Sequence, residues 1–115
     1  MPMKASKIII LIAIFFTGLQ LSAQETSLQK KTFKVWGNCD MCKSTIEKAA
    51  KSVDGVSSAK WNVSSKKMMV KFDSDRTSLE DIQNAIVSSG YDLETQKSSE
   101  EAYNNLHKCC QYDRE

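Results

Sequence analysis

Apolar and polar positions follow two different periods in the first part of the chain. Residues 31–36 alternate, with Phe33 and Val35 on one side and lysines on the other, which is typical of a half-buried strand. Beyond Cys39 the period becomes helical, and a run ending at Asp54-Gly55 carries one apolar face. The members of that face are Cys42, Ile46, Ala49 or Ala50, and Val53. The pattern therefore predicts a strand followed by an amphipathic helix of about three turns.

Strict alternation returns in the middle of the chain. Residues 56–63 form a second extended stretch, and residues 64–67 are a polar turn before a third run in which every other residue is apolar. The alternating apolar residues of the third run are Met68, Val70 and Phe72. These two stretches are expected to pair as a β-hairpin.

A second helix is indicated by its start and stop signals. Thr77 and Glu80 have the Thr-x-x-Glu spacing of a capping box, apolar residues follow at helical spacing, and Gly90 ends the run. Residues 91–96 alternate again and are predicted to be an edge strand. The order strand, helix, strand, strand, helix, strand is the split βαβ arrangement, an α+β fold whose four-stranded antiparallel sheet carries both helices on one face.

This pattern sets the predicted domain boundaries. The folded unit spans residues 31–97, after a polar leader at 24–30 and before a tail at 98–115 that carries His107, Cys109 and Cys110. Because the tail is assigned no part in the core, deletion of residues 108–115 is expected to leave the fold intact. A single domain of this size is expected to be a monomer.

The N-terminus has the layout of a secretory signal peptide. Twelve largely apolar residues, 8–19, follow Lys4 and Lys7 and precede a short stretch with small residues. A membrane span needs about 20 apolar residues, so an uncleaved anchor is the weaker interpretation. We expect cleavage after Ala23, a mature protein that does not span the membrane, and export to the periplasm or a similar oxidising compartment.

Composition and charge narrow the partners. The 115 residues include 16 Lys and Arg against 14 Asp and Glu, a net charge of +2 that falls to zero once Lys4 and Lys7 are removed. Nucleic-acid binding depends mainly on phosphate neutralisation, so a neutral mature chain argues against that partner. The chain is also too short for a large enzyme with a deep cofactor cleft.

Cys39 and Cys42 carry the candidate chemistry. They lie where the first strand meets the first helix, so both sulfurs can converge near the unpaired N–H groups of the first turn, which favour thiolates. Two thiolates suit Cu(I) first and Hg(II) second, whereas structural zinc wants about four ligands, so Zn(II) or Cd(II) ranks third. An undersaturated surface site can pass its ion to another thiol, which is the behaviour of a carrier.

Other interpretations of the cysteines stay open. Cys39 and Cys42 could form a structural disulfide, or act as a thiol–disulfide oxidoreductase, although the only proline is Pro2 and such enzymes place a cis-proline opposite the pair. Cys109 and Cys110, with His107 nearby, could form a second soft-metal site or complete the first. They could equally bridge to each other or to another chain.

The segment Gly37-Asn38-Cys39-Asp40-Met41-Cys42, the Gly90-Tyr91 pair and the six-element order together resemble the heavy-metal-associated domain family over residues 32–96. Members include the periplasmic mercuric-ion-binding protein and copper metallochaperones. The resemblance implies a ferredoxin-like fold, metal binding by the two cysteines, and Tyr91 packed near their sulfurs. It also implies docking on a metal-transporting membrane protein or another such domain. The family usually reads Gly-Met-x-Cys, but Trp36 and Gly37 stand at the first two positions here, so we expect Trp36 to fill the space of the methionine.

Overall fold

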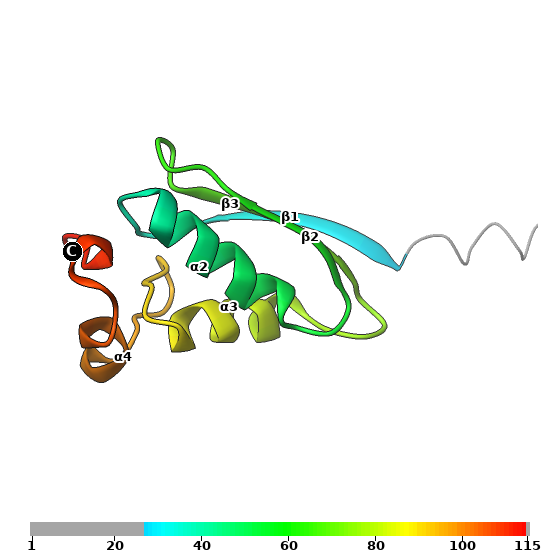
Figure 1. Ribbon diagram of the computed structural model, residues 1–115. Helices are drawn as coiled ribbons and strands as arrows, with labels where there is room; N and C mark the ends of the chain where they lie inside the picture. The colour runs from blue at the N-terminus through cyan, green and yellow to red at the C-terminus, as the bar shows by residue number, and fades with distance from the viewer. Residues whose placement is uncertain (1–26, 115) are drawn as a thin grey trace, which may run out of the picture.

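Three strands form one antiparallel sheet in the order β1-β3-β2 within residues 27–114, the part of the chain that the computed structural model describes (Figure 1). Helices α2 (Asp40–Lys51) and α3 (Leu79–Ser88) pack side by side on one face of the sheet. The strands are β1 (Leu28–Lys34), β2 (Val56–Trp61) and β3 (Lys67–Asp73). This arrangement confirms the predicted α+β class with both helices on one face.

The predicted signal peptide, residues 1–23, lies outside the described residues, as do residues 24–26 of the predicted leader. The rest of that leader is more ordered than expected, because β1 begins at Leu28 and pairs there with Asp73 of β3. Its side chains are mostly exposed, with Leu28 at 68%. Backbone pairing thus extends the strand where the apolar pattern is silent. Within residues 27–114, none of the helices has the length and apolar character needed to cross a membrane.

Helix α2 confirms the helical prediction after Cys39. Its buried face consists of Cys42, Ile46 and Ala50, which recur every four residues. Asp40 in the first turn and lysines in the last turn both complement the helix dipole. The helix is held to β2 by Glu47, whose carboxylate accepts the backbone N–H of Trp61 at 2.8 Å. The site at the start of α2 is therefore anchored to the sheet.

Strands β2 and β3 form the predicted hairpin. Ala59 pairs with Val70 and Trp61 with Met68, which places these buried residues opposite each other. Lys66 closes the turn with a φ of +63°, in the left-handed region. The hairpin contributes much of the core beneath the two helices.

The start of α3 differs by one residue from the predicted capping box. Ser78, not Thr77, is the N-cap, and its hydroxyl accepts the N–H of Asp81. The hydroxyl of Thr77 is instead buried without a hydrogen-bond partner among the described residues. Asp81 lies three residues after Ser78, so the acidic partner of the motif also shifts by one.

The predicted fourth strand, residues 91–96, is reduced to a single bridge between Val35 and Leu93 in the described structure. One further backbone bond joins the Trp36 N–H to the Asp92 carbonyl at 3.0 Å. The chain then turns, because the Leu93 N–H bonds to the carbonyl of Gln96 at 2.8 Å. The sheet therefore has three strands where the alternation predicted four.

The last segment returns to the domain instead of leaving it. Helix α4 (Glu100–Asn104) and the 3-10 helix η2 (Lys108–Cys110) bring the C-terminal end beside the start of α2 (Figure 1). Cys110 and Tyr112 are 2% and 3% exposed and belong to the hydrophobic core. The core thus continues past residue 97, where the apolar periodicity of the sequence ends.

Candidate metal centre

Cys39 and Cys42 converge at the mouth of α2. Cys39 is the N-cap residue and Cys42 lies in the first turn, and their sulfurs are 3.5 Å apart. Cys42 is fully buried while Cys39 is half-buried. All four cysteines of the chain fall within the described residues and are free thiols. One sulfur of the pair is thus sheltered and the other is open to solvent.

Hydrogen bonds prepare these two sulfurs differently. The backbone N–H of Cys42 lowers the pKa of the Cys39 thiol, as expected for a sulfur placed at a helix N-terminus. The thiol of Cys42 donates to the side-chain carbonyl of Asn38 at 3.0 Å. Cys39 is therefore the more readily ionised and more accessible partner, which suits it to be the first to meet an incoming ion.

Cys110 brings a third sulfur to the pair from the far end of the chain. The sulfurs of Cys39, Cys42 and Cys110 all lie within 4.8 Å of one another. Burial, together with the neighbouring Cys42, raises the pKa of the Cys110 thiol to about 12. Among the described residues this is the cluster of side chains best arranged to hold a soft metal ion.

The other two tail residues singled out from the sequence lie elsewhere. The Cys109 side chain is exposed, with its sulfur 3.6 Å from the thioether of Met41, whereas its carbonyl lies 3.6 Å from the sulfur of Cys39. His107 is exposed and caps η2 without a side-chain hydrogen bond. The structure thus separates the tail candidates: Cys110 joins the cluster, Cys109 borders it, and His107 stands apart.

Tyr91 lies behind the sulfurs. Its side chain is completely buried, and its hydroxyl has no hydrogen-bond partner among the described residues. Burial, together with the sulfurs of Cys42 and Cys110, raises the pKa of Tyr91 far above its usual value. A buried unpartnered hydroxyl is costly, and it becomes satisfied once a neighbouring sulfur is a metal-bound thiolate. The residues present therefore fit a thiophilic ion.

The space beneath the metal loop is filled by Trp61, not by Trp36. A side chain at Gly37 would meet the Trp61 ring at 2.9 Å and Ile46 at 3.2 Å, so the loop rests directly on these two residues. The Trp61 indole N–H also donates to the carbonyl of Val35 at 3.0 Å. Trp36 is half-buried, with the Lys34 ammonium 4.5 Å from its ring. The expectation for Trp36 was wrong because cross-strand packing brings Trp61 underneath.

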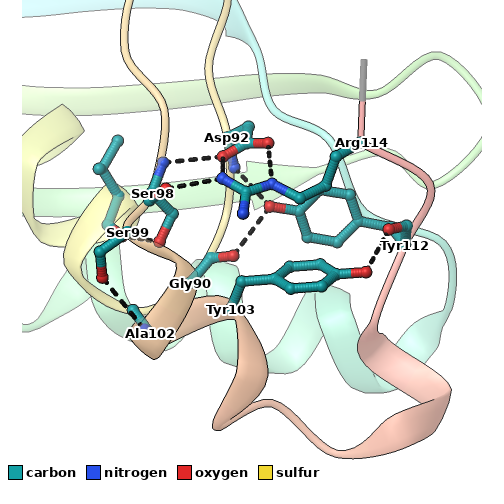
Figure 2. A network of polar contacts seen from close by, with 9 residues as sticks. Gly90, Asp92, Ser98, Ser99, Ala102, Tyr103, Tyr112 and Arg114 are labelled. Atoms are coloured by element: carbon teal, nitrogen blue, oxygen red, sulfur yellow. Dashed lines mark hydrogen bonds and ion pairs between the residues drawn. The ribbon is translucent and has the colours of Figure 1, made fainter.

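Tyr112 fixes the tail to the loop after α3 (Figure 2). Its hydroxyl donates to the carbonyl of Gly90 at 2.8 Å and accepts the N–H of Asp92 at 2.9 Å. Its carbonyl accepts the Tyr103 hydroxyl at 2.6 Å, and its ring stacks on Tyr91 with centroids 5.6 Å apart. Tyr112 is two residues after Cys110, so these bonds position the third sulfur.

Arg114 adds an ion pair to this attachment (Figure 2). Its guanidinium donates to both oxygens of Asp92 at 2.9 Å and to the carbonyl of Ser98 at 2.6 Å. Burial raises the pKa of Asp92, but the bonds from Arg114 and from the Ser98 N–H outweigh it and hold that pKa below its usual range. We call the contacts of Asp92, Tyr112 and Arg114 the tail latch.

Sequence reasoning missed the latch residues. Asp92 and Tyr112 bond each other across twenty positions, and no local spacing announces such a pairing. The available signal was compositional: Tyr103, Leu106 and Tyr112 are large apolar or aromatic residues in an otherwise polar tail. Residues of this kind are buried more often than a disordered extension would require.

Comparison with known proteins identifies relatives of the folded unit. Residues 32–92 match the heavy-metal-associated domain. The copper chaperone CopZ of Bacillus subtilis is 37% identical over 67 residues, covering 57% of this chain and 97% of that protein.

Two solved structures extend the comparison. Oxidized MerP from Ralstonia metallidurans CH34 has a TM-score of 0.54 and 30% identity, with 58% of this chain and 97% of that chain covered. The N-terminal domain of a potential copper-translocating P-type ATPase from Bacillus subtilis, in its Cu(I)-loaded state, has a TM-score of 0.55 and 28% identity. That match covers 57% of this chain and 84% of the domain.

Proposed function

The chain belongs to the heavy-metal-associated domain family, and from this premise we propose that it is a metallochaperone that carries Cu(I) between Cys39 and Cys42. The ion passes to a partner by exchange of one thiolate ligand for another. The observation that carries this proposal is the sulfur pair itself, 3.5 Å apart at a helix N-terminus, with one member half-buried and one fully buried. Such a pair holds an ion and still lets a second protein reach it.

Copper(I) is preferred because the ligands are soft and few. Thiolates select Cu(I), and a cluster of three sulfurs falls short of the four ligands of structural zinc. Hg(II) is the second choice, supported by the likeness to MerP, and Zn(II) or Cd(II) is the third. The likeness to the copper chaperone CopZ favours copper among these ions.

The partner we propose is another domain of the same family, either free or part of a metal-transporting membrane protein. The likeness to the Cu(I)-loaded domain of a copper-translocating P-type ATPase supports this kind of partner. We further propose that the protein acts outside the cytoplasm as a monomer, with residues 1–23 as its export signal. Measuring the mass of the secreted protein tests the export step, since cleavage after Ala23 leaves 92 residues.

Replacement of both cysteines tests the metal site. In protein 24–115 handled without oxygen, Cys39→Ser with Cys42→Ser is expected to abolish one equivalent of tight Cu(I) binding. Competition with bathocuproine disulfonate measures that equivalent. His107→Ala, an exposed change outside the cluster, is the control and should bind as the wild type does. A double variant that keeps the full equivalent would move the site to the tail and contradict the proposal.

The same protein distinguishes a carrier from an oxidoreductase. Both activities draw on a thiol of lowered pKa at a helix N-terminus, as Cys39 has. A carrier binds Cu(I) stoichiometrically and does not turn over, whereas an oxidoreductase reduces insulin disulfides catalytically. Sustained insulin reduction that depends on Cys39 and Cys42 would replace the carrier proposal.

A further inference from the structure

The structure assigns Cys110 as a third metal ligand, and we propose that the carrier holds Cu(I) in a trigonal site of three thiolates that the C-terminal tail completes. This inference rests on the proposed function. Cys39 and Cys42 come from the start of α2, whereas Cys110 comes from η2, more than sixty residues later. The third ligand thus lies outside residues 32–92, which carry the family match.

The sulfur separations favour three ligands over two. With metal–sulfur bonds of about 2.3 Å, a linear two-sulfur site needs about 4.6 Å between its sulfurs and a trigonal one about 4.0 Å. The sulfurs of Cys39 and Cys42 are 3.5 Å apart, closer to the trigonal value, and Cys110 lies within 4.8 Å of both. A trigonal site therefore requires smaller movements of the pair than a linear one.

Cys110 is held in place from both sides. Its N–H bonds to the carbonyl of His107 at 2.8 Å, and its carbonyl accepts the N–H of Tyr112 at 2.9 Å. The tail latch then fixes Tyr112 to the loop after α3. The sulfur is 2% exposed and faces the Cys39–Cys42 pair, so little side-chain entropy is lost when it binds an ion.

The charge of a three-thiolate site also matches its surroundings. Binding Cu(I) to three thiols forms three Cu–S bonds, releases three protons and leaves a net charge of −2. A buried negative charge needs hydrogen-bond donors. The unpartnered hydroxyl of Tyr91, which the sulfurs of Cys42 and Cys110 influence, is placed to donate to them.

Completion of the site by the tail also restricts access. The carbonyl of Cys109 lies 3.6 Å from the sulfur of Cys39, so η2 covers one side of the sulfur that a partner must reach. Transfer to a partner then requires Cys110 to be displaced by an incoming thiolate. The tail therefore makes the ion harder to lose to small chelators than a two-sulfur site would.

X-ray absorption of the Cu(I)-loaded protein counts its sulfur ligands. We expect three in the wild type and two in Cys110→Ser, with affinity lowered at least about tenfold, since even an outer partner of a metal ligand is worth about 10–100-fold. Cys109→Ser, the neighbouring exposed cysteine, is the matched control and should keep three ligands. A wild-type count of two, unchanged in Cys110→Ser, would overturn the inference while leaving the proposed function intact.

A second variant avoids the risk that Cys110→Ser disturbs the core. Met41→Leu combined with Cys109→Ser alters only exposed side chains and removes the other sulfurs that border the site. A count of three in this variant identifies Cys110 as the third ligand, and a count of two excludes it. A wild-type protein that binds no Cu(I) at all would instead refute the proposed function.

Discussion

The two cysteine pairs of this protein are positioned by different means. Cys39 and Cys42 are three residues apart at a helix start, so helix geometry alone brings their sulfurs together. Cys109 and Cys110 are adjacent, and their side chains diverge, one exposed and one buried. Only contacts with the distant loop at Gly90 set the position of the second pair. The first pair therefore depends on local sequence, whereas the second depends on tertiary structure that can be removed separately.

Deleting residues 108–115 should have the largest effect on this comparison. The change removes buried Cys110 and Tyr112, and loss of one large buried aromatic typically costs about 3–5 kcal/mol. Urea unfolding should show a drop in the free energy of unfolding of about that size, a large part of a small domain's total. The first pair should still bind one Cu(I), now through two sulfurs.

His107→Ala is the control for the deletion, since it alters an exposed side chain in the same segment and is expected to change the free energy of unfolding by less than about 0.5 kcal/mol. A truncated protein as stable as the wild type would show that the tail only rests on the domain. That outcome would restore the boundary at residue 97 that the sequence suggests.

Tyr112→Phe should have a smaller effect, because the ring stays and only the hydroxyl is lost. The Asp92 N–H and the Gly90 carbonyl would be left buried without this partner, at a cost of about 1–3 kcal/mol. Thermal unfolding measures the loss. Tyr103→Phe, which removes a half-buried hydroxyl bond to the same residue, should cost less. Equal costs would mean that the latch does not act through Gly90 and Asp92.

The ion pair of Asp92 should give the smallest effect, visible as a pH dependence. The folded pKa of Asp92 lies below its unfolded value of about 3.9, so the stabilisation is complete above that pH and is lost as the pH falls through the folded pKa. The gap in unfolding free energy between wild type and Asp92→Asn should therefore shrink as the pH is lowered from 7 towards 2. Asp113→Asn, an exposed neighbour, should show no such gap. A gap that stays constant with pH would exclude the charge of Asp92 as its source.

The elements that could be predicted from sequence are those whose signals are local. The helix after Cys39, the hairpin and the second helix each follow from spacing within about a dozen residues, and the structure confirms them. Errors of one residue, as at Ser78, arise because two adjacent hydroxyl residues offer equivalent caps. The approach of the Cys39 and Cys42 side chains to each other is of the same local kind.

The features that could not be predicted depend on contacts between distant residues. The alternation at 91–96 suggested a strand, but the Asp92 carboxylate bonds the N–H of Ser98 and Leu93 turns back on Gln96. Likewise, no local pattern indicates that Cys110 meets Cys42 or that Trp61 lies under Gly37. Side chains that bond across twenty or more positions leave no periodic trace in the sequence.

The place of Arg114 has a practical consequence for anyone who produces this protein. Its guanidinium is seated on Asp92 and Ser98, so a purification tag fused to the C-terminus would begin beside a partly buried salt bridge. A bulky or acidic fusion there would compete with Asp92 for that arginine. Recombinant samples meant for metal titration should therefore carry their tag at the opposite terminus or have it cut off.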